Sequence, residues 1–134
     1  MYINLPPIAR YQHMDASDRE LCARGLGSRH AARDLPTAAD PNHLSAHESL
    51  GAMACGAHRD NGPEAAARVL LAYRTGHNIT ALGYRPHPDH PSALAEHKPT
   101  FTDAVFREAA ARVLSRTDEG SLTTAEQHQI LTHL

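Results

Sequence analysis

Histidine is the residue type in this chain whose number and spacing most suggest chemistry. There are 11 histidines in 134 residues, and His43 and His47 stand four residues apart in a segment of helical character. Residues at i and i+4 share one face of a helix, so these two imidazoles could hold a divalent metal ion, with His58 further along that face. Glu48 follows the second histidine, whereas zinc peptidases place a glutamate between the two. The favoured expectation is a protein without cofactor or catalytic activity. A metal-dependent enzyme that uses these histidines is the alternative hypothesis.

A second set of polar residues is better suited to contact with another molecule. The first predicted helix carries several arginines, but Asp18 and Glu20 are interleaved with them, which makes a face of mixed charge. The segment 77–99 is rich in histidine and proline, and an irregular segment of this length is usually either functional or disordered. The predicted binding surface consists of Arg24, Arg29, Arg33, His77, Tyr84, Arg85, His87, Asp89 and His90.

The segment 61–76 is predicted to be the central helix that positions these groups. Asn61 is suited to cap a helix, and Glu64, three residues later, would complete a capping box. Gly76 is expected to end this helix in a left-handed conformation. Its apolar face consists of Ala66, Val69, Leu70 and Tyr73.

Two helices are expected before this one. A capping box of Ser17 and Glu20 predicts a helix from about residue 18 to 24, with Leu21 pointing inward. We expect Gly25 and Gly27 to interrupt that helix, because glycine is a poor helix former. The next helix is predicted over about 42–57.

Two further helices are expected after the irregular segment 77–99. The first covers about 100–116, begins at Thr100 and carries an apolar stripe that includes Val105 and Phe106. The last begins with a capping box of Thr123 and Glu126 and continues to the end of the chain.

Alanine dominates the apolar composition and limits the core. Hydrophobic residues make up 41% of the chain, but 23 of them are alanine, while Leu, Ile, Val, Met and Phe together number 26. Alanine favours helix and buries little surface, so we expect close-packed helices around a thin core, which a partner or a second copy would stabilise. The predicted fold is mainly α: a single domain, 1–134, of about five helices, with an extended N-terminal arm over 1–14. The alternative is an α+β fold with one strand pair, 2–8 with 78–84.

Charge and hydropathy exclude several classes of function. The net charge is −2 and both halves carry mixed charges, so binding to nucleic acid through a basic surface is not favoured. No signal peptide or membrane-spanning run is found, which predicts a cytoplasmic location. Arginine outnumbers lysine twelve to one, which indicates a bacterial, phage or plasmid source.

The favoured function is a small protein-binding module that covers a surface of another protein, as an inhibitor or adaptor. A nucleic-acid-binding regulator with a helix-turn-helix is a further alternative, after the metal-dependent enzyme.

Overall fold

The structure is a computed structural model that describes residues 14–32, 44–83, 100–115 and 122–134, and for residues 44–47 and 83 it describes the backbone alone. The helices in this part of the chain are α2 (Ala16–Ala32), α3 (Leu44–Asn61), α4 (Pro63–Gly83), α5 (Asp103–Ser115) and α6 (Thr124–Thr132). These residues contain no strand. The mainly α prediction is therefore confirmed. The strand-pair alternative is wrong, because 78–83 belongs to α4, while 2–8 lies outside the described residues.

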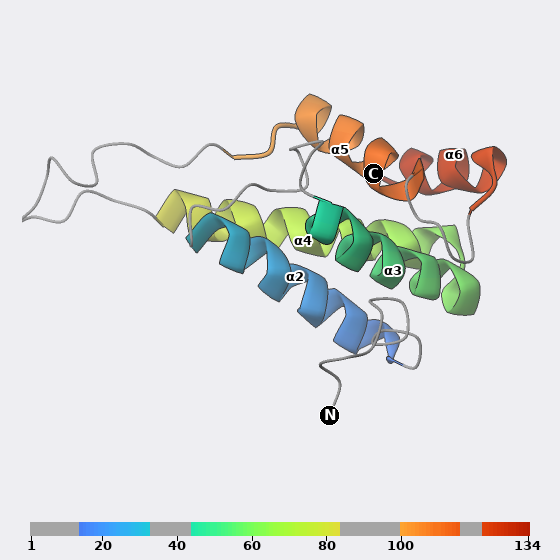
Figure 1. The fold of residues 1–134 in the computed structure, drawn as a ribbon, viewed down its shortest axis with the longest axis horizontal. Coiled ribbons are helices and arrows are strands. Elements are labelled where there is room, and N and C mark those ends of the chain that lie inside the picture. The colour runs from blue at the N-terminus through green and yellow to red at the C-terminus, as the bar shows by residue number, and fades with distance from the viewer. Residues whose placement is uncertain (1–13, 33–43, 84–99, 116–121) are drawn as a thin grey trace, which may run out of the picture.

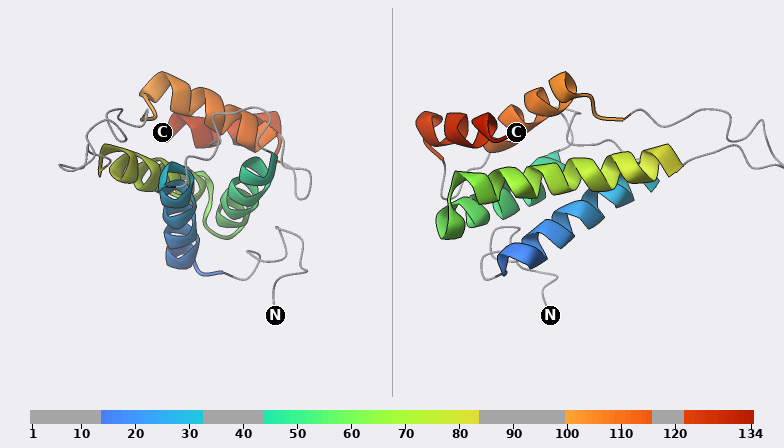
Figure 2. Two further views of the ribbon diagram at one scale, coloured as in Figure 1. Left: turned by 60° about the vertical axis from the view of Figure 1, so that its left-hand side comes forward. Right: turned by 180° about the vertical axis from the view of Figure 1, so that it is seen from behind.

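Helix α4 is at the centre of the fold, as the sequence predicts. It packs against α2, α3 and α6, and α5 packs against α3 and α6. Helices α2 and α3 lie along α4, while α5 and α6 cover its other side (Figures 1 and 2). None of the helices described combines the length and apolar character needed to cross a bilayer.

Three glycines that were expected to break helices lie inside them instead. Helix α2 is continuous through Gly25 and Gly27, and α4 continues beyond Gly76 to Gly83. A Cβ atom on Gly27 would overlap the carbonyl of Tyr73, and one on Gly76 would overlap the carbonyl of Arg24. The missing side chains thus let α2 and α4 touch backbone to backbone. This tertiary contact outweighs the helix-propensity cost of glycine, about 1 kcal/mol per residue.

The connection between α3 and α4 is a single glycine. Asn61 is the last residue of α3, so the prediction that it caps α4 is wrong. Gly62 has φ +88°, its N–H donates to the carbonyl of His58 over 2.8 Å, and its carbonyl accepts from the Ala66 N–H over 3.3 Å. Glycine adopts this left-handed conformation without strain, and Pro63 follows at the first position of α4, where its missing N–H costs nothing.

Threonine side chains cap the starts of α5 and α6, whereas the box predicted for α2 does not form. The Thr123–Glu126 capping box is confirmed, with both hydrogen bonds present at 3.1 and 2.8 Å. Helix α5 is capped by Thr102 and not by Thr100, because the Thr102 hydroxyl accepts from the Val105 N–H over 3.3 Å. The predicted Ser17–Glu20 box is wrong: Ser17 lies inside α2, and the carboxylate of Glu20 contacts α4 instead.

The core is as rich in alanine as the composition predicts. Of the 23 buried hydrophobic residues in the described part of the chain, eleven are alanine. The large buried side chains gather on α4 and the residues that pack on it. They include Leu50, Leu70, Tyr73, Phe101, Phe106 and Ile130.

Candidate functional site

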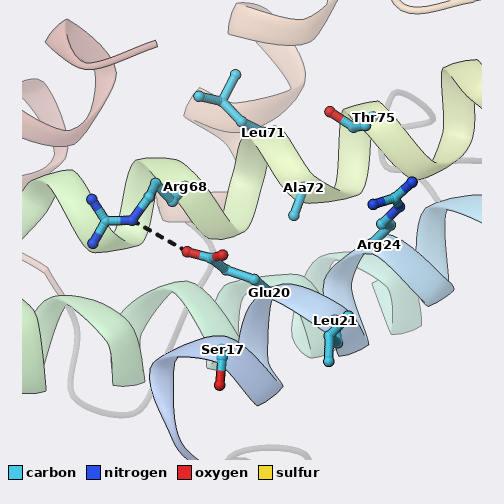
Figure 3. Close-up of a pocket in the computed structure, with 8 residues that line it drawn as sticks. All are labelled: Ser17, Glu20, Leu21, Arg24, Arg68, Leu71, Ala72 and Thr75. Carbon is cyan, nitrogen blue, oxygen red and sulfur yellow. Dashed lines mark hydrogen bonds and ion pairs between the residues drawn. The ribbon is translucent and has the colours of Figure 1, made fainter.

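An open groove between α2 and α4 is the candidate functional site (Figure 3). Its volume is about 490 Å³. The walls combine leucine side chains with charged and hydroxyl groups from the two helices. The groove is lined by Ser17, Glu20, Leu21 and Arg24 of α2 and by Arg68, Leu71, Ala72 and Thr75 of α4.

The glycine contact explains where the groove lies. Contacts join Glu20 to Arg68 and Ser28 to Thr80, so the two helices run roughly parallel. They are closest where Gly27 and Gly76 meet the backbone of the other helix. From that contact α2 and α4 diverge toward the N-terminus of α2 (Figure 1). The space between the diverging helices is the groove.

The charged groups of the groove differ in how they are paired. Nε of Arg68 donates to Oε1 of Glu20 across the groove over 3.2 Å, and Arg68 also lies 3.7 Å from Glu64. Arg24 is exposed, and its guanidinium projects beside Thr75 in Figure 3. Among the described residues, Arg24 forms no ion pair. It is therefore the cation in this groove that an incoming group could engage.

A row of residues on α4 extends the groove along the helix. Leu71, Thr75, Ile79 and Leu82 follow one another at spacings of four, four and three, so they lie on one face, which we call the α4 stripe. Ile79 is 56% exposed and Leu82 is 60% exposed. Across the groove, Leu21 is 65% exposed, so the prediction that it points inward is wrong. The sequence does not predict this stripe, because Gly76 is expected to end the helix.

The predicted binding surface is only partly visible. Arg24 and Arg29 are exposed on α2. Six of the predicted residues lie outside the described residues: Arg33, Tyr84, Arg85, His87, Asp89 and His90.

His77 is a correction to that predicted surface, because it is buried with 5% of its surface exposed. Its ring packs edge-on against Phe101, with 4.8 Å between centroids. Nδ1 of His77 lies 3.2 Å from Oδ1 of Asn78 and donates to it, because that oxygen also accepts from the Phe101 N–H. Burial lowers the pKa of His77 below its usual value. This histidine therefore holds the fold together and is not available to a partner.

The same end of α4 forms hydrogen bonds with Phe101, which stands just before α5. The side-chain amide of Asn78 accepts from the Phe101 N–H over 2.8 Å and donates to the Phe101 carbonyl over 3.2 Å. Arg74 donates to that carbonyl as well, over 3.2 Å, and pairs with Asp103 over 2.7 Å. These contacts fix the position of the start of α5 on α4.

Arg19 has a structural role that sequence reasoning did not identify. Its guanidinium is buried beside Gly56, and Nη2 lies 2.8 Å from Oδ2 of Asp60. Hydrogen bonds from Arg59 and then from Arg19 lower the pKa of Asp60 to about 2. A buried arginine needs such a partner, because transfer of its charge out of water is costly. Arg19 thus ties α2 to the end of α3 and is not part of an exposed basic face.

The described residues include only part of the histidine cluster proposed as a metal site. His43 lies outside the described residues, and the side chain of His47 is not described. Nε2 of His58 lies 3.8 Å from Oε2 of Glu126. Among the residues that are described, no three His, Cys, Asp or Glu side chains are grouped so that they could hold a metal ion. A site built from His43, His47 and His58 stays a prediction.

Comparisons of the chain with protein-family models, with curated proteins and with solved structures find no match. Its function is therefore inferred from the geometry of the groove and the α4 stripe.

Proposed function

We propose that this chain is a small protein-binding module that covers a surface of another protein, as an inhibitor or an adaptor. The groove between α2 and α4 carries the proposal, because it presents the exposed side chain of Leu21 and the half-buried side chain of Leu71 next to the exposed cation of Arg24. Exposed apolar side chains that are gathered on one face and rimmed by polar groups are typical of protein-binding surfaces.

The shape of the groove also favours a large ligand over a small molecule. Sites for small molecules usually enclose most of the surface of the ligand. The groove is open, whereas an enclosed void among the described residues, beside Tyr73 and Phe106, does not admit a water molecule. A partner that lies along the groove and the α4 stripe would bury the exposed Leu21, Ile79 and Leu82 together.

Affinity capture with matched variants tests this proposal. Leu21→Asp and Ile79→Asp each place a charge on an exposed residue of the proposed surface, and Val105→Asp makes the same change on α5, where the side chain is 42% exposed. Circular dichroism and thermal unfolding would first show that all three variants fold. We expect a partner from the source cell to be retained by the parent chain and by Val105→Asp, and lost from the two groove variants. A partner set that is the same for all four proteins would contradict the proposal.

A further inference from the structure

We infer that the groove and the α4 stripe bind an amphipathic helix of a partner protein, and that this helix carries a carboxylate near its midpoint. The inference rests on the proposed function and adds the chemistry of the partner.

The form of the α4 stripe is suited to a helix, with Leu71 half-buried and the three residues after it exposed. Leu71, Thr75, Ile79 and Leu82 follow the alternation of three and four residues by which one helix packs against another. Helices α2 and α4 run in the same general direction and diverge from the glycine contact, so a third helix can lie in the space between them. An extended peptide usually binds by adding to the edge of a sheet, and the described part of the chain contains no strand. A helix needs no such edge, because its backbone hydrogen bonds are internal.

The length of the surface sets the length of the helix. From Arg68 to Leu82 the axis of α4 rises by roughly 21 Å, at about 1.5 Å per residue. A partner helix of about four turns would therefore cover the groove and the stripe together.

The position of Arg24 indicates where the partner carries its charge. The Arg24 backbone contacts Gly76, and its side chain lines the groove with Thr75, so the guanidinium lies near the middle of the surface. At the far end, Arg68 is already paired with Glu20 and Glu64. An acidic side chain in the middle of the bound helix would pair with Arg24, and a basic one would be repelled.

The same charge argues against a second copy of this chain as the occupant. Two α4 stripes could pair in antiparallel fashion about Thr75, because Leu71 and Ile79 stand at equal distances from it in sequence. However, that arrangement brings the two Arg24 side chains together near the symmetry axis. Like charges at the centre of an interface disfavour association.

Binding of designed peptides to the full chain tests the inference. Three helical peptides of about 16 residues would share one leucine pattern, matched to the α4 stripe, and differ only in a central flanking residue: Glu, Gln or Lys. By fluorescence anisotropy at low salt, we expect the Glu peptide to bind about tenfold more tightly than the Lys peptide, with the Gln peptide between them. The difference should shrink at high salt.

A charge reversal provides the control for this experiment. In Arg24→Glu, the order of the Glu and Lys peptides should invert. Leu21→Asp and Ile79→Asp should weaken all three peptides, while Val105→Asp should leave them unchanged. The inference is overturned if no peptide binds, if the three bind equally, or if Arg24→Glu keeps the original order.

Two further outcomes separate this inference from the proposed function. A dimer of the full chain in sedimentation experiments, dissociated by Ile79→Asp, would show that a second copy occupies the stripe and would overturn the inference. A captured partner that depends on Leu21 and Ile79, together with peptides that do not bind, would leave the proposed function standing and remove the acidic helix. Captured partners that bind all variants normally would contradict both the proposed function and the inference of a partner helix.

Discussion

The two sides of α4 hold their neighbours in different ways. Toward α5, aromatic rings fill the space: Tyr73 and Phe101 lie 6.0 Å apart between centroids, and Phe101 and Phe106 lie 5.9 Å apart. Cζ of Arg74 lies over the ring of Phe106, 5.3 Å from the ring centroid. This side is an ordinary core of large side chains, in which each ring removes apolar surface from water.

Toward α2, the two helices are in direct backbone contact, and no large side chain separates them at that point. Gly27 and Gly76 let the two backbones meet, and short polar contacts lie beside them. The hydroxyls of Ser28 and Thr80 are 2.6 Å apart, and Nδ1 of His30 lies 2.7 Å from the hydroxyl of Tyr73. A chain with few large apolar residues can thus stabilise one helix on both sides. The groove opens on the side where the glycine contact ends.

The largest effect is expected on the aromatic side. Phe106→Ala removes a buried ring and leaves a cavity, so it should lower the free energy of unfolding by about 3–5 kcal/mol. Urea unfolding measures this loss. Val105→Ala, at an exposed neighbour, should change the stability by less than about 0.5 kcal/mol. Equal stability of the two variants would contradict the assignment of this side as the core.

On the α2 side of α4, adding a side chain should destabilise the fold, whereas on the α5 side removing one should do so. Gly27→Ala and Gly76→Ala each place a methyl group on the opposite backbone and should lower the free energy of unfolding by about 1–3 kcal/mol. Gly25→Ala is the matched control, because a Cβ there meets nothing within 4 Å. It should leave stability unchanged or raise it by up to about 1 kcal/mol, as alanine favours helix. If Gly27→Ala behaved like Gly25→Ala, the backbone contact would not limit the approach of the helices.

Tyr73 serves both sides, with its ring against Phe101 and its hydroxyl at His30. Tyr73→Phe keeps the ring and removes the hydrogen bond, so it should lower the free energy of unfolding by about 1 kcal/mol. The comparison variant is Phe101→Leu, which changes the ring contact of Tyr73 with Phe101 and keeps the hydroxyl contact of Tyr73 with His30. If Tyr73→Phe were fully neutral in urea unfolding, the polar link to α2 would contribute nothing to stability.

The pH dependence should be the smallest effect, and it reports on His77. Burial lowers the pKa of this histidine in the folded chain, so between that lowered pKa and about 6.5 the unfolded chain binds more protons. The contribution of His77 to stability is therefore present above pH 6.5 and is lost as the pH falls through this window. His77→Gln should lose less stability between pH 7.5 and pH 5.5 than the parent chain does. His128→Gln, at an exposed position, controls for the other histidines, and an unchanged slope in His77→Gln would contradict the assignment.

The candidate site was harder to predict from the sequence than the fold. Of the predicted binding residues that the structure describes, Arg24 lines the groove, whereas Leu21 was expected in the core and His77 on the surface. Each apolar or polar type has an average preference for burial, but the neighbour that packs on a given helix face decides the individual case. The α4 stripe follows from the spacing of Leu71, Ile79 and Leu82 once Gly76 is part of the helix.

Taken alone, the amino-acid sequence determined the features that depend on near neighbours along the chain. The helical class, the central position of α4, the Thr123–Glu126 cap and the buried faces around Tyr73 and Phe106 follow from helix propensity, capping hydrogen bonds and apolar spacing. Tertiary structure alone decided that Gly27 and Gly76 join helices instead of ending them, that Arg19 is buried, and that a groove opens beside Leu21. These outcomes depend on which backbone lies opposite a residue, and residues about fifty positions apart meet only when the chain is folded.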